Sequence, residues 1–181
     1  MRNRNAAFQK KQDQKGFTLI EFMIVVALIA VSILAILGYK SLAKSDSTTG
    51  TETNNVAVMT TKMPKLKAAG SYGTSGTDLM PALIALGGVP STMSITGNTV
   101  TNSWGGSVTA SSTGPGYTIT YNNVPKDACV SLAGGMSGGS SGDMTTSING
   151  GSAISGAVQG SQSATACSSE TANTVAWTYT N

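Results

Sequence analysis

An acidic residue inside a long apolar run is the feature of this sequence that most suggests chemistry. The run "FTLIEFMIVVALIA" covers residues 17–30, and Glu21 is the only charged residue within it. A charge at the centre of a membrane-spanning helix costs about 2.5–3.5 kcal/mol. The carboxylate is therefore predicted to have a partner or a function.

The other residue types give no catalytic or metal-binding pattern. The chain has no histidine, which removes Ser-His and Cys-His nucleophile pairs and the commonest metal ligand. Two cysteines are too few for a structural zinc site. The Gly-rich run "GGMSGGSSGD" lacks the Gly-Lys-Ser/Thr ending of a phosphate loop. We therefore expect no catalytic residue, no metal and no cofactor, and an exported enzyme is the last of the alternatives.

Charge is concentrated at the N-terminus. Charged residues make up 10% of the chain, which is not the composition of a nucleic-acid-binding protein. Five of the eleven basic residues precede Gly16, so the remainder of the chain is nearly neutral. Basic residues before an apolar segment keep the N-terminus in the cytoplasm. The sequence therefore predicts a cytoplasmic N-terminus and an exported remainder.

The apolar segment is long enough to cross a membrane. Residues 22–38 are all apolar or small except Ser32. At about 1.5 Å per residue, a helix over residues 17–43 reaches roughly 40 Å, which is enough to span the hydrocarbon core. Apolar residues surround the whole predicted helix, as in helices buried in lipid or in a bundle.

Export also bears on the two cysteines, Cys129 and Cys167. In an oxidising compartment two cysteines in one domain usually pair, so we expect a disulfide between them. The alternative is two separate buried thiols.

The remainder of the chain predicts an α+β fold with helix packed on a largely antiparallel sheet. Residues 45–55 are polar and form either a break or the exposed middle of one long helix. Helical spacing resumes at residues 56–66 with Pro64 inside it, which predicts a kink or an early end.

Shorter elements follow along the chain. Residues 77–90 predict a short helix that is capped by Thr77 or Asp78 and ended by Gly87-Gly88. Alternation predicts strands at 106–111, 117–124 and 174–180. Residues 133–166 are mostly Gly, Ser, Thr and Ala, and we expect loops with short strands there.

Three interpretations of the N-terminus compete. A secretory signal would be cleaved after "SLA" at residues 41–43, but its apolar core would be long and Glu21 would have no purpose. A plain membrane anchor explains the length and leaves Glu21 equally unexplained. The third interpretation is a leader that is cleaved before the apolar segment.

The third interpretation agrees with a family resemblance. The stretch "KGFTLIEFMIVVALIA" resembles the processing site and N-terminal helix of type IV prepilins, which type II secretion pseudopilins share. The stretches "AAGSYGTSGTDLMPALIALGGVPSTM", "NSWGGSVT" and "YTITYNNVPKDACVSL" are similar to the bundle-forming and thin-pilus pilins of the type IVb group. The long leader also points to that group.

The resemblance assigns roles to individual residues. It implies that a prepilin peptidase cuts between Gly16 and Phe17 and methylates the new N-terminus at Phe17. Glu21 is then the acid at the fifth mature position, where it would pair with a Phe17 ammonium during assembly. The implied parts are a leader at 1–16, an N-terminal helix at 17–69 with its membrane and filament-core portion at 17–43, and a globular α+β head at 70–181.

The function implied is that of a structural subunit, a major pilin of a bacterial type IVb pilus. Its partners would be copies of itself, the inner membrane before assembly, the prepilin peptidase and the assembly machinery, and a receptor on host cells or on other bacteria, with no nucleic acid. The pilus would serve adhesion, bacterial aggregation or mating-cell contact. Alternatives are a minor pilin, a type II secretion pseudopilin, or a monomeric membrane-anchored binding protein.

Overall fold

The computed structural model describes residues 19–137 and 143–180, and their side chains except those of Glu21 and residues 30–46. The chain divides into two compact units, residues 1–42 and residues 43–181. Most of the described structure belongs to the second unit, which contains the sheet and its covering helices.

One helix, α1 (Leu19–Lys62), contains both the apolar segment and the polar stretch at 45–55. Of the two possibilities that the polar stretch allows, the structure therefore has the continuous helix. The helix ends at Lys62, two residues before Pro64, and the 3₁₀ turn η1 (Met63–Leu66) follows directly. Because proline lacks an N–H and its ring clashes with the preceding turn, this early end agrees with the prediction.

Within the second unit, one stripe of α1 is buried. Val56, Met59 and Met63 are completely buried and belong to the hydrophobic core. They are spaced by three or four residues, which places them on one face of the helix. Thr49, Glu52 and Asn55 are also buried, so the polar stretch is not simply the exposed middle of a helix.

The sheet has seven strands in the order β1-β2-β3-β4-β7-β5-β6, and every pairing between neighbours is antiparallel. The strands are β1 (Ser94–Thr96), β2 (Thr99–Thr101), β3 (Ser107–Ser112), β4 (Tyr117–Val124), β5 (Met144–Ile148), β6 (Ile154–Ser155) and β7 (Asn173–Tyr179). The predicted α+β class is confirmed, and β3, β4 and β7 confirm the three predicted strands. The C-terminal strand lies inside the sheet, between β4 and β5.

The short helix α2 (Met80–Ala85) confirms the prediction for residues 77–90 with one correction at its start. The N-cap residue is Leu79, and its side chain makes no capping hydrogen bond. Asp78 lies one residue before this N-cap and accepts a hydrogen bond from the Met80 N–H (2.9 Å). The helix ends as predicted: the Gly88 N–H donates to the Leu83 carbonyl and Gly87 has a positive φ of 66°.

The expectation of loops and short strands over 133–166 is partly wrong. Helix α3 (Lys126–Ser137) enters this region, and helix α4 (Gly160–Ala166) closes it. Strands β5 and β6 lie between them. The buried residues Ala128, Cys129, Leu132 and Ala133 give α3 an apolar face, and this burial against the sheet outweighs the low helix propensity of Gly134 and Gly135.

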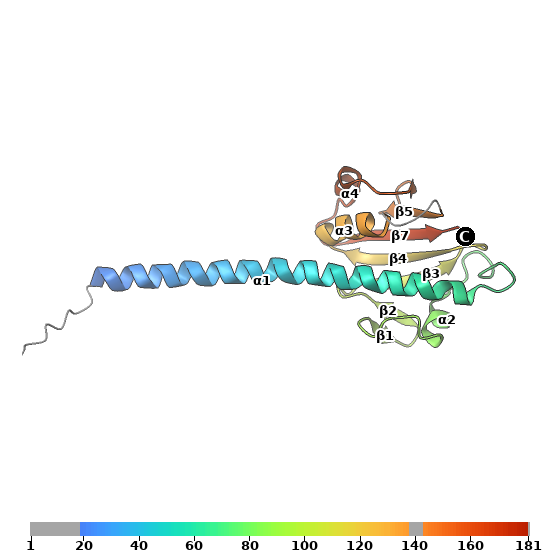
Figure 1. Ribbon diagram of the computed structural model, residues 1–181, viewed down its shortest axis with the longest axis horizontal. Helices are drawn as coiled ribbons and strands as arrows, with labels where there is room; N and C mark the ends of the chain where they lie inside the picture. The colour runs from blue at the N-terminus through green and yellow to red at the C-terminus, as the bar shows by residue number, and fades with distance from the viewer. Residues whose placement is uncertain (1–18, 138–142, 181) are drawn as a thin grey trace, which may run out of the picture. The chain divides into compact units, whose positions relative to one another are not determined.

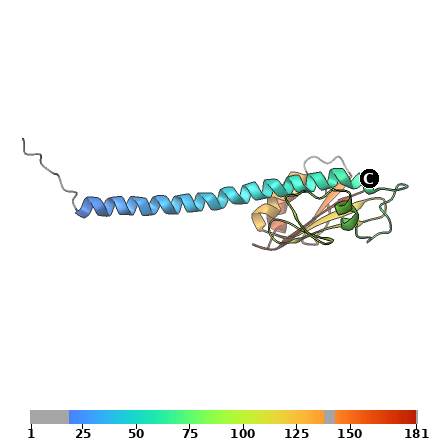
Figure 2. The ribbon, with the colours of Figure 1, turned by 90° about the horizontal axis from the view of Figure 1, so that it is seen from below.

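The second unit has two layers. Its part of α1 lies along one face of the sheet (Figures 1 and 2). Along β4 and β5 buried and half-exposed residues alternate, so one face of each strand is in the core and the other is open. The core contains Ile119, Tyr121 and Trp177 from the sheet, with Tyr121 and Trp177 packed edge to face at 5.7 Å between ring centroids.

Candidate assembly site

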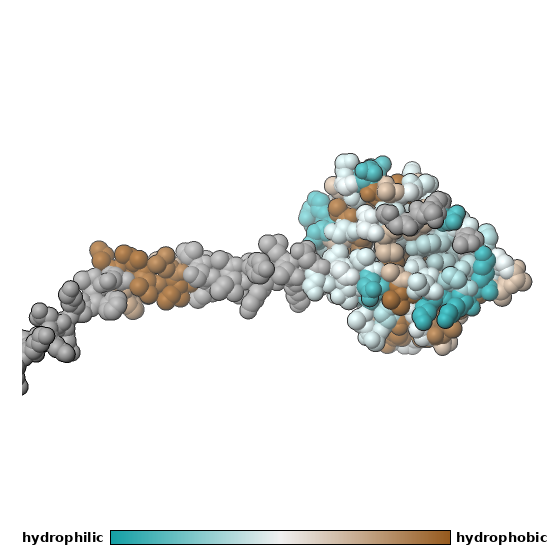
Figure 3. Space-filling view, in the orientation of Figure 1, coloured by the Kyte–Doolittle hydropathy of each residue, from teal (hydrophilic) through white to brown (hydrophobic). Residues whose placement is uncertain are grey.

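The first described residues of α1 present apolar side chains to solvent. Large apolar side chains between Leu19 and Ile29 are 43–80% exposed. Residues 22–26 are consecutive and all exposed, and a helical turn takes only 3.6 residues, so the exposure extends around the helix. Figure 3 shows the hydrophobic colour of this segment. An apolar surface of this kind marks a site of contact with protein or membrane.

The predicted processing residues fall at the edge of this segment. Gly16 and Phe17 lie outside the described residues. Glu21 belongs to α1, and its side chain lies outside the described part. None of the helices in the described ranges combines the length and apolar character that a membrane span requires. The predicted segment 17–43 includes residues whose side chains the structure does not describe.

A second carboxylate of α1, Glu52, is buried in the head, and it is not among the site residues that the sequence predicts. Its side chain is completely inaccessible to solvent. The spacing could have indicated this position, because Glu52 lies four residues before Val56 and so continues the buried stripe toward the N-terminus. Burying an ionised group is costly unless other groups satisfy it.

Hydrogen bonds satisfy both oxygens of Glu52. Oε1 accepts from the Ser103 N–H (2.7 Å) and from the Ser103 hydroxyl. Oε2 accepts from Asn55 Nδ2 (3.0 Å) and from the Tyr121 hydroxyl (3.3 Å). Burial raises the pKa of Tyr121 well above its usual range, and the charge and hydrogen bond of Glu52 raise it further, so the phenol stays protonated and donates.

The turn that carries Ser103 is itself fixed from two sides. Asn102 Oδ1 accepts from the backbone N–H groups of Trp104 and Gly106, and Asn102 Nδ2 donates to the Asn122 carbonyl. A Cβ at Gly106 would lie 1.8 Å from the Asn122 carbonyl oxygen, so only glycine fits there. Glu52 thus ties α1 to a rigid turn between β2 and β3.

We expect Glu52→Ala to lower the free energy of unfolding of the head by about 2–4 kcal/mol, because it leaves the Ser103 and Asn55 donors buried without an acceptor. Thermal and urea unfolding of the full chain in detergent, followed by circular dichroism, measures this loss. Glu52→Gln should cost less, since Asn55 and Thr92, whose side chains are joined at 2.6 Å, can reorient to accommodate an amide.

The matched control is Glu170→Ala. Glu170 pairs with Lys126 at 2.7 Å, but its side chain is 77% exposed. Exposed ion pairs contribute less than about 1 kcal/mol. Equal losses in Glu52→Ala and Glu170→Ala would show that the buried network does not stabilise the head.

The disulfide joins the two helices that the sequence did not indicate. Cys129 in α3 and Cys167 at the C-cap of α4 are bonded, with their Cα atoms 6.0 Å apart, and both side chains are completely buried. Since α4 has only seven residues, it would be marginal without an attachment. The bridge fixes α4 to α3, and the loop after Cys167 continues to β7.

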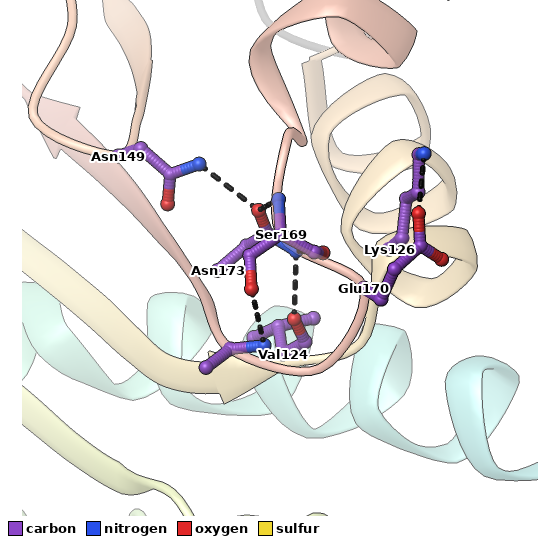
Figure 4. Close-up of polar contacts among 7 residues, drawn as sticks. Val124, Lys126, Asn149, Ser169, Glu170 and Asn173 are labelled. Carbon is purple, nitrogen blue, oxygen red and sulfur yellow. Dashed lines mark hydrogen bonds and ion pairs between the residues drawn. The ribbon is translucent and has the colours of Figure 1, made fainter.

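A buried asparagine organises the loop between Cys167 and β7, as Figure 4 shows. Asn173 Nδ2 donates to the carbonyls of Val124 (3.0 Å) and Ser169 (2.6 Å). Its Oδ1 accepts from the Ser169 N–H (3.0 Å) and from Asn149 Nδ2 (2.9 Å). One fully bonded side chain therefore connects the ends of β4 and β5 to the start of β7.

Within the second unit, Glu52 and Asn173 both bond to β4 near its end, at Tyr121 and Val124. The exposed apolar segment between Leu19 and Ile29 belongs to the first unit. Within the described ranges, no group of carboxylates or cysteines could hold a metal ion. The described residues therefore include a hydrogen-bonded, disulfide-linked head and a helical segment whose apolar side chains are exposed.

Comparisons with known proteins identify this arrangement. A family model described as PilS N terminal matches residues 46–180, and a model described as the prokaryotic N-terminal methylation motif matches residues 11–37. A crystal structure of the type IV b pilin from Salmonella typhi is similar, with 28% identity and a TM-score of 0.60 over 73% of this chain and 99% of that chain. The comparison with curated proteins found no match. Since the PilS model covers most of the chain and the similar structure is a pilin, the chain belongs to the PilS family and is a type IVb pilin.

Proposed function

We propose that the chain is the major subunit of a type IVb pilus, a structural protein that leaves the inner membrane and polymerises into a surface filament. The observation that carries the proposal is the apolar surface of α1 between Leu19 and Ile29, which is exposed on all sides. Lipid would cover this surface before assembly and the helices of neighbouring subunits afterwards. Head-to-tail contacts that do not close into a ring would produce a helical filament.

The proposed processing step removes residues 1–16. The methylation-motif match over residues 11–37 supports cleavage between Gly16 and Phe17 by a prepilin peptidase, followed by N-methylation of Phe17. Glycine at position 16 suits a peptidase that must approach the backbone closely, because any side chain there would obstruct it. Cleavage removes five of the eleven basic residues and leaves residues 17–43 as the membrane segment of a single-pass precursor.

Glu21 has the proposed role of guiding assembly. Cleavage would place an ammonium group at Phe17, one helical turn before Glu21. At 4 Å and an effective dielectric constant near 20, such a pair is worth about 4 kcal/mol before desolvation. In an apolar filament core, the Phe17 ammonium of an incoming subunit would find its partner in the Glu21 carboxylate of a neighbour, which would fix the axial register.

We expect the mature protein to begin at N-methyl-Phe17. Intact-mass and tandem mass spectrometry of the protein from a sheared cell-surface fraction measures its N-terminus directly. A chain that begins at Lys44 would indicate a secretory signal, and an intact Met1 would indicate a plain anchor. Either result contradicts the proposal.

The same fraction tests the assignment as the major subunit. Electron microscopy with quantitative immunoblotting should find this chain as the most abundant protein of the filaments. Filaments that contain it only in trace amounts would make it a minor pilin. The proposed uses of the filament are adhesion, bacterial aggregation or mating-cell contact, all of which place the head against other surfaces.

A further inference from the structure

The open face of the sheet has an unusual composition. Apart from Asn123 at the irregularity near the end of β4, the residues of β3, β4, β7 and β5 that point away from the core are all Ser or Thr except Asn122 and Ala176. They are Ser107, Thr109, Ser111, Thr118, Thr120, Asn122, Thr174, Ala176, Thr178, Thr145 and Ser147. We call this set the hydroxyl face. It contains no charged residue and no large apolar side chain.

The strand register places these hydroxyls in rows across the sheet. Ser111 pairs with Thr118, Thr118 pairs with Thr178, and Thr178 pairs with Thr145. The next row contains Thr109 beside Thr120. Neighbouring strands lie about 4.7–4.9 Å apart, so the rows form a regular array of hydroxyl groups. In Figure 2, α1 lies on the opposite side of the sheet.

Hydrogen bonding divides the hydroxyl face into two regions. In the first region the side chains already have partners: at the starts of β3 and β7, Asn122 bonds to Ser107 and accepts from Thr174. Farther along the sheet, Thr118 and Thr178 share a hydrogen bond of 2.8 Å, and Ser147 donates to the Gly151 carbonyl. Within the described part of the chain, no hydrogen bond joins the side chains of Thr109, Ser111 or Thr120 to another residue. The second region therefore has donors and acceptors available for a ligand.

A cavity of about 320 Å³ adjoins this second region. It lies where β3 changes partners: β2 pairs with β3 as far as Val108, and residues 77–79 bond to β3 from Ala110 onward. Thr109 and Ser111 line it from β3, Asn98 and Thr99 from the β1–β2 hairpin, and Asp78 from the start of α2. Its volume is at the lower end of the range of about 300–1,000 Å³ for small-molecule sites.

The polar groups of the cavity are held in place. Asp78 Oδ1 accepts the Met80 N–H at 2.9 Å, so the backbone of α2 orients the carboxylate. Within the residues that the structure describes, Asp78 forms no ion pair with a lysine or an arginine. The other polar residues are short, and ordering a short side chain costs little conformational entropy compared with ordering a lysine or glutamate.

We propose that the cavity and the adjoining hydroxyl face bind a neutral glycan chain. Sugar hydroxyls both donate and accept, which suits a surface of Ser, Thr and Asn groups with one carboxylate. An anionic polymer is disfavoured, because Asp78 repels it and the cavity has no cationic side chain. One or a few sugar residues would occupy the cavity, and the glycan would continue along the rows of the hydroxyl face.

The test measures binding of the full chain in detergent micelles to immobilised dextran, mannan, galactan and chitin oligosaccharides, with heparin as the anionic comparison. We expect saturable binding to at least one neutral glycan and none to heparin. Thr109→Glu should weaken that binding about tenfold or more, because the bound glycan would desolvate the introduced carboxylate without neutralising it. Thr109→Val keeps the shape and strand propensity and should weaken it about fivefold through the lost hydrogen bond.

The control is Ser161→Glu, which makes the same kind of change at an exposed position of α4, and its affinity should equal that of the unmodified chain. Three results would each overturn the proposal: no saturable binding to any neutral glycan in the set, binding to heparin alone, or equal losses in Ser161→Glu and both Thr109 variants. Because the measurement uses unassembled chain, its outcome is independent of whether the chain polymerises.

Discussion

Cells that produce the Glu21→Val variant should contain inserted, cleaved pilin and few or no filaments. The substitution removes a charge whose placement in the apolar segment costs about 2.5–3.5 kcal/mol, so residence in the membrane becomes easier. It also removes the proposed partner of the Phe17 ammonium, which then has to enter the filament core unpaired. A buried charge without its partner is strongly destabilising, so we expect the filament yield to fall at least tenfold.

The comparison separates assembly from processing. Immunoblots of the membrane fraction should show the same extent of leader cleavage in Glu21→Val and unmodified cells, while the sheared fraction loses pilin. Glu21→Asp, which keeps the charge on a shorter side chain, should retain part of the yield. Ser32→Val makes the same apolar segment more hydrophobic without changing its charge, and should assemble normally. Normal numbers of pili in Glu21→Val cells would contradict the charge-pairing account.

Loss of the Cys129–Cys167 disulfide should lower the free energy of unfolding of the head by roughly 3–4 kcal/mol, the unfolded-chain entropy that the loop model assigns to a bridge of this size. The cysteines are 38 positions apart, and much of the intervening segment is glycine and serine. Such residues bury little apolar area in return for the entropy they lose on ordering. A loss of this size is a large share of the usual stability of about 5–15 kcal/mol.

Cys129→Ser should therefore make the head sensitive to proteolysis and reduce the pilus yield, while cleavage at Gly16 continues. The double variant Cys129→Ala, Cys167→Ala separates the loss of the bridge from the cost of burying a serine hydroxyl or a lone thiol. Unfolding midpoints of the unmodified chain with and without dithiothreitol provide an independent measurement. An unchanged midpoint on reduction, or two reactive thiols in unreduced pili, would refute a stabilising bridge.

Local patterns were sufficient for several parts of this protein. The apolar segment with its single acid and the preceding Lys-Gly step is enough to indicate the class of subunit. Alternation placed β3, β4 and β7 correctly because each strand has one face in the core and one outside. Pro64 and the pair Gly87-Gly88 marked helix ends through their backbone properties. Proline lacks the N–H that a continuing helix needs, and glycine adopts the positive φ at which many helices end.

Contacts between distant segments decided the remainder. Glu52 is buried because Ser103 and Tyr121, 51 and 69 positions away, bring donors to it, and a polar stretch such as 45–55 does not reveal such donors. Helix α3 forms although Gly134 and Gly135 disfavour it, because its apolar face packs against the sheet. The hydroxyl face exists only because β7 inserts between β4 and β5. Each strand by itself determines which side chains point outward, but the order of the strands, set by packing of the whole sheet, determines which hydroxyls become neighbours.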